Sequence, residues 1–464
     1  MKIISKTFKL LTVFALVLGL TGCSDDDDNN IIVETPLNIV ELASSNPNLS
    51  SLVAALQAAD GDLPTVLSGP GPFTVLAPTN DAFDAFLGDD ELGDIPTDVL
   101  AQVLLNHVIT GEVTSSDLVA QGSGYASTNA TSPGGQNISI FFDTTNGVEF
   151  NGVSSVVTGG ADVEASNGVV HVVDAVIGIP DVVDHAVANP NLSTLVTALT
   201  DNNLVSALQA DGPFTVLAPT NDAFANFTNP DGNALADILL NHVIAAPILS
   251  GDLVNLGSGY SNTLATGPND EALSIYFDTS DGVTFNGAAS VSQADIVGSN
   301  GVIHVVDNVI DIPTIATFAT SNPALSTLVD ALVFADGGTP TVPYIDTVSD
   351  PTAGPFTVFA PTNDAFGDVL AELSLTGFGE GMDELNAATT DAVLTYHIVA
   401  ANVQSDELMS GPVATLGGTI TADAMNFTLT DPNDRVSNII TSLVDIQGAN
   451  GVVHVIDTVI LPSL

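Results

Sequence analysis

Positive charge is almost missing from this sequence, since 4 of its 464 residues are Lys or Arg, against 55 Asp and Glu. Three of the bases, Lys2, Lys6 and Lys9, precede a short apolar run, and the fourth is Arg435. From residue 23 onward one base therefore faces 55 acidic residues, a formal charge of −54. Binding to nucleic acid depends on neutralised phosphates, and anionic membranes attract basic surfaces. We therefore exclude a nucleic-acid-binding protein and a folded part that docks on anionic membrane.

Tryptophan and cysteine are scarce as well. The chain has no Trp and only 5% aromatic residues, so Val, Leu, Ile, Ala and Phe must form its cores. Cys23 is the only cysteine, which excludes a disulfide within the chain. Polysaccharide sites favour exposed aromatic rings, and five Tyr without Trp give such a site little support.

The N-terminal segment indicates export. Its apolar run "LLTVFALVLGL" has 11 residues, whereas a membrane span needs about 20, so we interpret residues 1–22 as a secretory signal peptide. The segment ends in "LTGC", which resembles a bacterial lipobox and predicts an acylated Cys23; the alternative is a lone buried thiol. The acidic run "SDDDDNN" cannot collapse and predicts a solvated tether over 23–34. It also resembles the surface-export signal of some Gram-negative lipoproteins, so we expect a lipid-anchored protein of the outer membrane that faces the cell exterior.

One segment occurs three times in the chain. "GPFTVLAPTNDAF" spans 71–83 and 212–224, and it returns at 354–366 with one change. Each copy follows an "NP…LS…LV…AL" segment and precedes a closing "NGV…HV…D…VI" segment. The period of about 140 residues is the size of a complete domain. We predict three tandem domains, over 35–179, 180–312 and 313–464, and a semi-rigid rod because no Gly/Ser-rich linker separates them.

Each repeat has helices first and hairpins later. "LSSLVAAL" carries apolar residues at helical spacing. "PFTVLAP" predicts a buried strand, and "TNDAF" predicts a helix capped by Thr79, with Phe83 facing inward. The second half alternates in polarity and contains Asn-Gly and Asp-Gly turn signals. This order predicts α+β domains.

These repeated motifs resemble those of fasciclin domains. The third repeat matches best, with "FTVFAPTNDAF", the pair Tyr396-His397 and "NGVVHVIDTVI", while the first two have Asn106 and Asn241 where the family often has Tyr. The resemblance spans about 35 to 464. It implies that each domain is a wedge or sandwich of strands with helices packed along one side, and that the protein serves in cell-surface or matrix adhesion.

The histidines are the first candidates for chemistry. Six of the seven recur at matching places and are expected to be structural, bonded to backbone rather than catalytic or metal-bound: His107, His171, His242, His304, His397 and His454. Two per domain are few for a metal site, which takes three or four protein ligands. In "HVVD" the His and the Asp point to opposite faces of a strand, which excludes a general-base pair. The unrepeated His185 is expected to be solvated.

Serine and calcium motifs are weaker still. "GSGY", at 122–125 and 257–260, is not a nucleophile elbow, and we interpret it as a Gly-rich turn between strands. "DTSDG", with Asp278 and Asp281, faintly resembles a calcium loop but lacks the downstream Glu. We expect no cofactor and no dedicated metal site, and leave open diffuse Ca²⁺ binding by the acidic surface.

The fasciclin resemblance also implies interaction residues. In adhesive members of the animal matrix an Asp-Ile pair before the final "NGV" and the Tyr-His segment are linked to integrin binding. The matching residues here are Asp295, Ile296, Asp445, Ile446, Tyr396 and His397.

Together these features predict a non-enzymatic adhesion or interaction lipoprotein. Its expected partners are the membrane, through the N-terminal lipid only, and a cell-surface or matrix protein or polysaccharide. The alternative is a surface accessory protein that binds a ligand or polysaccharide with or without Ca²⁺.

Overall fold

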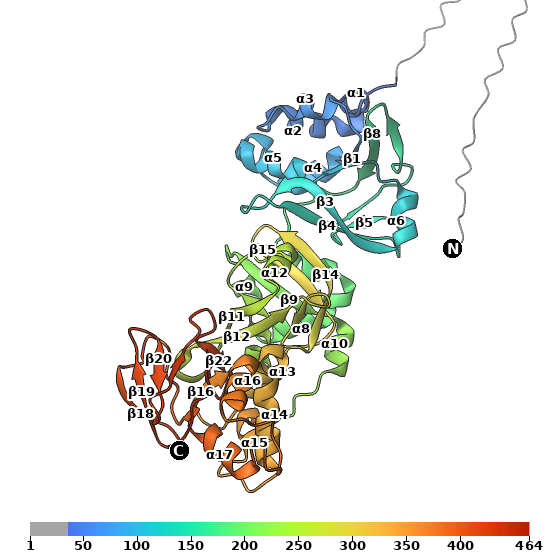
Figure 1. The fold of residues 1–464 in the computed structure, drawn as a ribbon. Helices are drawn as coiled ribbons and strands as arrows, with labels where there is room; N and C mark the ends of the chain where they lie inside the picture. Colours follow the sequence, from blue (N-terminus) through green and yellow to red (C-terminus); the bar gives the residue numbers. More distant parts are fainter. Residues whose placement is uncertain (1–35, 464) are drawn as a thin grey trace, which may run out of the picture. The chain divides into compact units, whose positions relative to one another are not determined.

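The computed structural model describes residues 36–463, so the predicted signal peptide, Cys23 and the tether lie outside the described residues. Helices precede the main hairpins in all three repeats, and the α+β prediction is confirmed. In domain 1, helices α1 to α5 gather at one end and the β3–β4 hairpin lies at the other (Figure 1). We call the repeats domains 1, 2 and 3, while their exact boundaries stay a prediction.

Domain 1 has one mixed sheet in the order β6-β5-β4-β3-β2-β1-β8-β7, in which β1 and β8 are parallel. Its helical elements are α1 (Ile39–Ser45), η1 (Pro47–Leu49), α2 (Ser50–Ala58), α3 (Leu63–Ser68), α4 (Asn80–Leu87), η2 (Leu92–Asp94), α5 (Thr97–Leu105) and α6 (Ser115–Gln121). Its strands are β1 (Phe73–Pro78), β2 (Val108–Thr110), β3 (Ser123–Thr131), β4 (Asn137–Asp143), β5 (Glu149–Phe150), β6 (Ser154–Ser155), β7 (Val163–Ala165) and β8 (Gly168–Val173).

Domain 2 repeats this plan and closes its strands in the order β10-β11-β12-β13-β14-β15-β9. Its helical elements are α7 (Val182–Ala188), η3 (Pro190–Leu192), α8 (Ser193–Asp201), α9 (Val205–Leu208), α10 (Asn221–Asn226), α11 (Leu235–Leu240), α12 (Ser250–Leu256) and η4 (Pro268–Asp270). Its strands are β9 (Phe214–Pro219), β10 (Val243–Ile244), β11 (Ser258–Thr266), β12 (Ala272–Asp278), β13 (Thr284–Phe285), β14 (Ala289–Gly298) and β15 (Gly301–Val306).

Domain 3 divides its strands between two sheets, β17-β16-β23-β22 and β18-β19-β20-β21. Its helical elements are α13 (Ile315–Ser321), η5 (Pro323–Leu325), α14 (Ser326–Asp336), α15 (Tyr344–Ser349), α16 (Asn363–Glu372) and α17 (Ala387–Thr395). Its strands are β16 (Phe356–Pro361), β17 (Ile398–Val399), β18 (Gly411–Ala414), β19 (Thr419–Asp423), β20 (Thr428–Thr430), β21 (Val436–Asn438), β22 (Ile446–Gly448) and β23 (Gly451–Ile456).

The thrice-repeated segment forms the centre of each domain. In domain 1 it is strand β1, followed by helix α4, whose N-cap Thr79 accepts the N–H of Ala82. Successive β1 side chains point to opposite faces, so Val75 joins the core beneath the helices and Leu76 joins the core inside the hairpins. The same parallel pairing and the same two cores recur in the other domains. The repeated segment therefore forms a buried strand that separates two hydrophobic cores.

The sequence predicted that the "GSGY" segment is a Gly-rich turn between strands, and that prediction is wrong. Gly122, with φ of 80°, ends helix α6, and Ser123 begins β3. Gly257 does the same between α12 and β11. A positive φ at a helix end favours Gly, because a side chain there is strained. The segment thereby places Tyr125 and Tyr260 on the first long strand of each hairpin.

Candidate functional site

Three of the repeated histidines join the end of a helix to the end of the domain. In each one Nδ1 donates to the carbonyl four residues earlier, at 2.7–2.9 Å, and Nε2 accepts a distant N–H at 2.9–3.0 Å. The donors of that N–H are Ile177, Ile310 and Ile460. Burial lowers the pKa of His107, His242 and His397 to about 4. The three rings are therefore neutral at neutral pH, with both nitrogens bonded to backbone.

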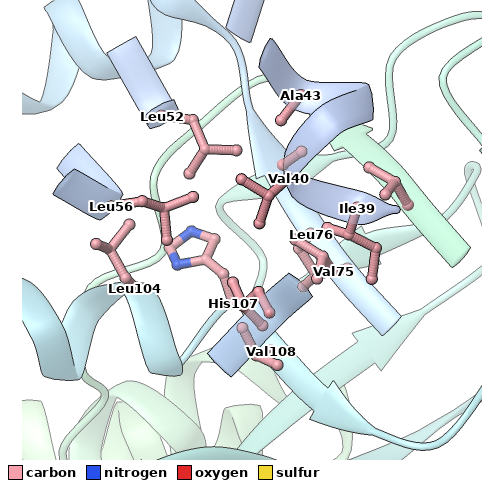
Figure 2. Close-up of a pocket in the computed structure, with 13 residues that line it drawn as sticks. Ile39, Val40, Ala43, Leu52, Leu56, Val75, Leu76, Leu104, His107 and Val108 are labelled. Atoms are coloured by element: carbon pink, nitrogen blue, oxygen red, sulfur yellow. The ribbon is translucent and has the colours of Figure 1, made fainter. Parts of the chain in front are cut away.

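A cavity of about 20 Å³ lies beside His107, lined by apolar side chains that include Leu56, Leu104 and Val108 (Figure 2). One water molecule needs roughly 10–15 Å³ of such space, while ligand pockets run to about 300–1,000 Å³. The cavity is thus a packing defect in the core of domain 1. It cannot hold a metabolite against the His107 ring.

The other three repeated histidines lie on β8, β15 and β23 beside an Asp and a Ser that sequence reasoning did not bring together. In domain 2, His304 Nδ1 accepts the Asp295 N–H at 3.3 Å, and its Nε2 donates to the Ile248 carbonyl at 2.9 Å. The Asp295 carboxylate accepts the N–H and the hydroxyl of Ser250. The same arrangement joins Ser115, Asp162 and His171 in domain 1, and Ser405, Asp445 and His454 in domain 3.

The three side chains of this Ser–Asp–His set contact one another in an order that suits a structural hydrogen-bond network and not nucleophilic catalysis. A catalytic triad needs the His between the Ser and the Asp, to take the hydroxyl proton. Here the Asp lies between them and both ring nitrogens are bonded to backbone. Burial lowers the pKa of His304 and of His454. In domain 2 the set joins the segment before the last strand to Ser250, the first residue of helix α12.

The expected Asp-Ile contact residues are divided between surface and core. Ile296 and Ile446 are each 1% exposed, so neither side chain can meet a partner. The Asp445 carboxylate is partly exposed while it bonds Ser405. A contact at this edge would therefore have to use the carboxylate.

The Tyr-His segment is also largely inside domain 3. His397 is buried, and the Tyr396 ring packs so closely on Gly417 and Gly418 that a Cβ on either glycine would overlap it. In domain 2 the matching Asn241 instead donates to the Asp311 carbonyl and accepts the Thr263 hydroxyl. The Tyr in domain 3 thus replaces a buried hydrogen-bonded amide by ring packing.

Of the two calcium candidates, Asp278 ends strand β12 and Asp281 lies in the turn between β12 and β13. Asp278 accepts the N–H and the hydroxyl of Ser280, and these bonds lower the pKa of Asp278. Within residues 36–463, no three His, Cys, Asp or Glu side chains are grouped closely enough to hold a metal ion. The geometry of Asp278 and Asp281 is that of a hairpin turn.

His185 is not solvated, and that prediction is wrong. The side chain is 0% exposed, because the ring lies against Tyr125 of the preceding domain, with centroids 5.6 Å apart. Nε2 bonds the Val297 carbonyl at 3.0 Å, and Nδ1 has no hydrogen-bond partner in the described part of the chain. Burial lowers the pKa of His185 to about 4. Contact with another domain is a cause of burial that the local sequence does not reveal.

Three segments of the chain, residues 47–180, 190–313 and 324–462, match the fasciclin domain family. The chain is 28% identical to human periostin over 443 residues, which cover 94% of this chain and 48% of periostin. It is 40% identical to the uncharacterized protein sll1735 of Synechocystis over 141 residues, 28% of this chain and 98% of that protein. The chain thus spans about half the length of periostin, while a stretch of about one domain's length aligns with nearly the whole of the smaller relative.

A solved structure, a FAS1 domain pair from the insect cell adhesion molecule Fasciclin I, aligns with a TM-score of 0.37 and 20% identity. That alignment covers 57% of this chain and 98% of the domain pair. Among the described residues no helix is both long and apolar enough to span a membrane.

Proposed function

Because this chain belongs to the fasciclin domain family, we propose that it is a non-enzymatic adhesion or interaction protein of the cell surface. The observation that carries the proposal is that both ring nitrogens of each repeated histidine are hydrogen-bonded to main-chain atoms, as in His107 and His304. Residues that are fully used in folding cannot also transfer protons to a substrate. The three domains share these buried hydrogen bonds, and a partner would contact their acidic surface.

We further propose that the protein lies on the outer membrane, facing the exterior, with acylated Cys23 as its only membrane contact. Support comes from the short apolar run before "LTGC" and from the acidic tether after it. A single exported cysteine has no disulfide partner within the chain. The partner would be a protein or a polysaccharide of a neighbouring cell or matrix, and Ca²⁺ would help two acidic surfaces to approach.

Pull-down of the acyl-free protein tests the adhesion proposal. The Cys23→Ser protein, without its signal peptide, is immobilised and offered whole cells and matrix polymers, with and without Ca²⁺. We expect saturable capture of one of these materials. The Asp445→Asn variant tests the edge with the exposed carboxylate, and Asp423→Asn, in the β19 hairpin turn, is the matched control. Absence of saturable capture with every material, or turnover of any of them, would reject the proposal.

Localisation of Cys23→Ser in cells tests the anchor. We expect the variant to be released from membranes while wild type stays bound and carries the mass of the lipid. A wild-type protein with unmodified mass that stays in the membrane fraction with the variant would contradict the lipid anchor.

A further inference from the structure

Domains 1 and 2 meet through one face of the β3–β4 hairpin. The Tyr125 hydroxyl donates to the His185 carbonyl and accepts from the Asn189 amide, both at 3.4 Å. The Ser139 hydroxyl accepts the Val297 N–H at 3.0 Å. Tyr125 belongs to domain 1, yet it packs against the core of domain 2. We call this contact joint 1.

Domains 2 and 3 meet through the matching residues, which we call joint 2. The Tyr260 hydroxyl accepts the Asn322 amide at 3.1 Å, and its ring lies 5.7 Å from that of Phe318. The Ser274 hydroxyl accepts the Gln447 N–H at 3.0 Å. The two joints are built at the same positions of the repeat, since Tyr125 and Tyr260 follow "GSG" and Asn189 and Asn322 begin "NP".

Part of joint 2 is buried as fully as a domain interior. Tyr276, which pairs with Tyr260 across the hairpin, is 2% exposed and belongs to the core cluster of domain 3. Burial also raises the pKa of Tyr260, and it raises the pKa of Tyr125 at joint 1 to about 12. A buried aromatic pair contributes about 0.5–1.5 kcal/mol beyond its buried area. The hairpin of one domain therefore completes the core of the next.

Domain 3 lacks this set of residues on its own hairpin. Strand pairing sets Tyr125 against Phe141 in domain 1 and Tyr260 against Tyr276 in domain 2, whereas domain 3 sets Pro412 against Thr421. The register is secured by the buried Ile that lies one residue before Phe141, Tyr276 and Thr421 in the three strands. The position of Ser139 and Ser274 is then taken by Thr419, which is exposed. Domain 3 thus has neither the aromatic pair nor the buried hydroxyl.

We propose that the hairpin face formed by Tyr125, Ser139 and Phe141, and by Tyr260, Ser274 and Tyr276, is a docking surface for the following fasciclin domain. Its partner is the first helix and the "NP" turn of that domain, together with the strand that precedes "NG". The surface couples three domains into one unit, and it is specified by residues that domain 3 does not have. A further fasciclin domain, from this chain or from a second copy, could not seat on domain 3 in the same way. This proposal is independent of the adhesion partner.

Thiol reactivity tests the two joints separately within the full chain. In a Cys23→Ser background the chain contains no other thiol, so Ser139→Cys reports on joint 1 and Ser274→Cys reports on joint 2. Each introduced thiol is buried when its joint is closed, because the parent serines are 7% and 2% exposed. The rate of labelling by a soluble disulfide reagent then measures the opening of one joint.

Tyr260→Ala should accelerate labelling at position 274 and leave position 139 unchanged, and Tyr125→Ala should do the reverse. The lost hydrogen bond and ring contact predict an increase of about tenfold or more. Loss of fold in the variant would expose both thiols, so position-specific acceleration separates joint opening from unfolding. Equal acceleration at both positions, or none at either, would overturn the proposal.

Cross-linking provides a second measurement, which reports the proximity of the two domains and not the opening of a joint. The pairs Ser139→Cys/Val297→Cys and Ser274→Cys/Gln447→Cys should oxidise to intramolecular disulfides, because each serine hydroxyl already contacts the main chain of its partner residue. The mismatched pair Ser139→Cys/Gln447→Cys is the control. Oxidation of the matched pairs no faster than that of the mismatched pair would also overturn the proposal.

Discussion

Domains 2 and 3 have the same helical half and different hairpins. Strand β9 pairs in parallel with β15, and β16 pairs in parallel with β23 in the same register. By contrast, β11 and β12 have nine and seven residues, while β18 and β19 have four and five. Helix α12, which precedes the hairpin of domain 2, has no counterpart between β17 and β18. The hairpin is therefore longer in domain 2, where domain 3 docks on it, than in domain 3.

This difference separates two kinds of constraint on one fold. The helical half must close a core in every domain, so its caps and buried amides recur. The hairpin of domain 2 must also match the surface of another domain, and it retains Tyr260 and Ser274 for that contact. In domain 3, Pro412 lies in an outer strand of the second sheet, a position that tolerates the missing N–H.

The strongest test of the shared half is the buried Asn of the closing motif. Asn300 donates to the carbonyls of Leu208 and Ala210, at 2.7 and 2.8 Å, and accepts the Val182 N–H. Asn450 makes the matching bonds in domain 3. Replacement of either Asn by Ala leaves several buried polar groups without partners and should destabilise its own domain by about 3 kcal/mol. Urea titration followed by pulsed hydrogen exchange, resolved by peptide, measures the free energy of unfolding of each domain. A much smaller loss for Asn450→Ala than for Asn300→Ala would show that the helical halves of domains 2 and 3 are not equivalent.

Acid should destabilise domain 2 more than domain 3. Both contain a helix-end His whose pKa is about 4 in the folded state, and domain 2 contains the buried His185 as well. An unfolded His has a pKa of about 6.5, so below that pH the unfolded state binds more protons than the folded state. Stability is therefore lost as the pH falls from about 6.5 to about 4, by on the order of 3 kcal/mol for each such His.

His185→Phe isolates this difference, because Phe318 occupies the matching position in joint 2. The variant should lose less stability in domain 2 between neutral pH and about pH 4.5, while domain 3 serves as an internal control. The same peptide-resolved urea titration at several pH values gives the answer. An unchanged pH dependence in the variant would show that His185 is not held neutral in the folded protein.

Tyr260→Phe and Tyr125→Phe should have smaller effects, and unequal ones. Each variant removes only a hydroxyl, which is worth about 1 kcal/mol. Tyr260 bonds Asn322 at 3.1 Å, whereas both Tyr125 bonds are 3.4 Å long. Joint 1 also borders an open groove of about 270 Å³ near Ser132 and Pro213. Thiol labelling at positions 274 and 139 should thus rise more for Tyr260→Phe than for Tyr125→Phe, and the reverse order would contradict this ranking of the joints.

The sequence predicted the features that depend on residues close together in the chain, and it missed those that depend on residues far apart in the chain. Thr79 caps α4 through an N–H three residues away, and the inward position of Phe83 follows from helical spacing. The partner of His107 at Ile177 is 70 residues away, and Asp162 reaches Ser115 across 47 residues from a backbone with a positive φ. His185 is buried by Tyr125, a residue of another domain. No local pattern contains these contacts, because the first two exist only after domain 1 has folded and the third only after two domains have met.

The smallest expected effect concerns salt, and it applies to both domains. A charge of −54 beyond residue 22 makes the folded chain repel itself, and ions relieve this within a Debye length of about 8 Å at physiological ionic strength. Melting temperature should therefore rise with NaCl. CaCl₂ should raise it further at matched ionic strength, because carboxylate oxygens such as those of Asp278 and Asp281 can coordinate the ion. Asp281→Asn should remove little of this calcium effect if binding is diffuse, and most of it if the β12–β13 turn is a discrete site. Identical NaCl and CaCl₂ curves would remove calcium from the proposed adhesion, and a melting temperature that falls with salt would contradict the repulsion on which this prediction rests.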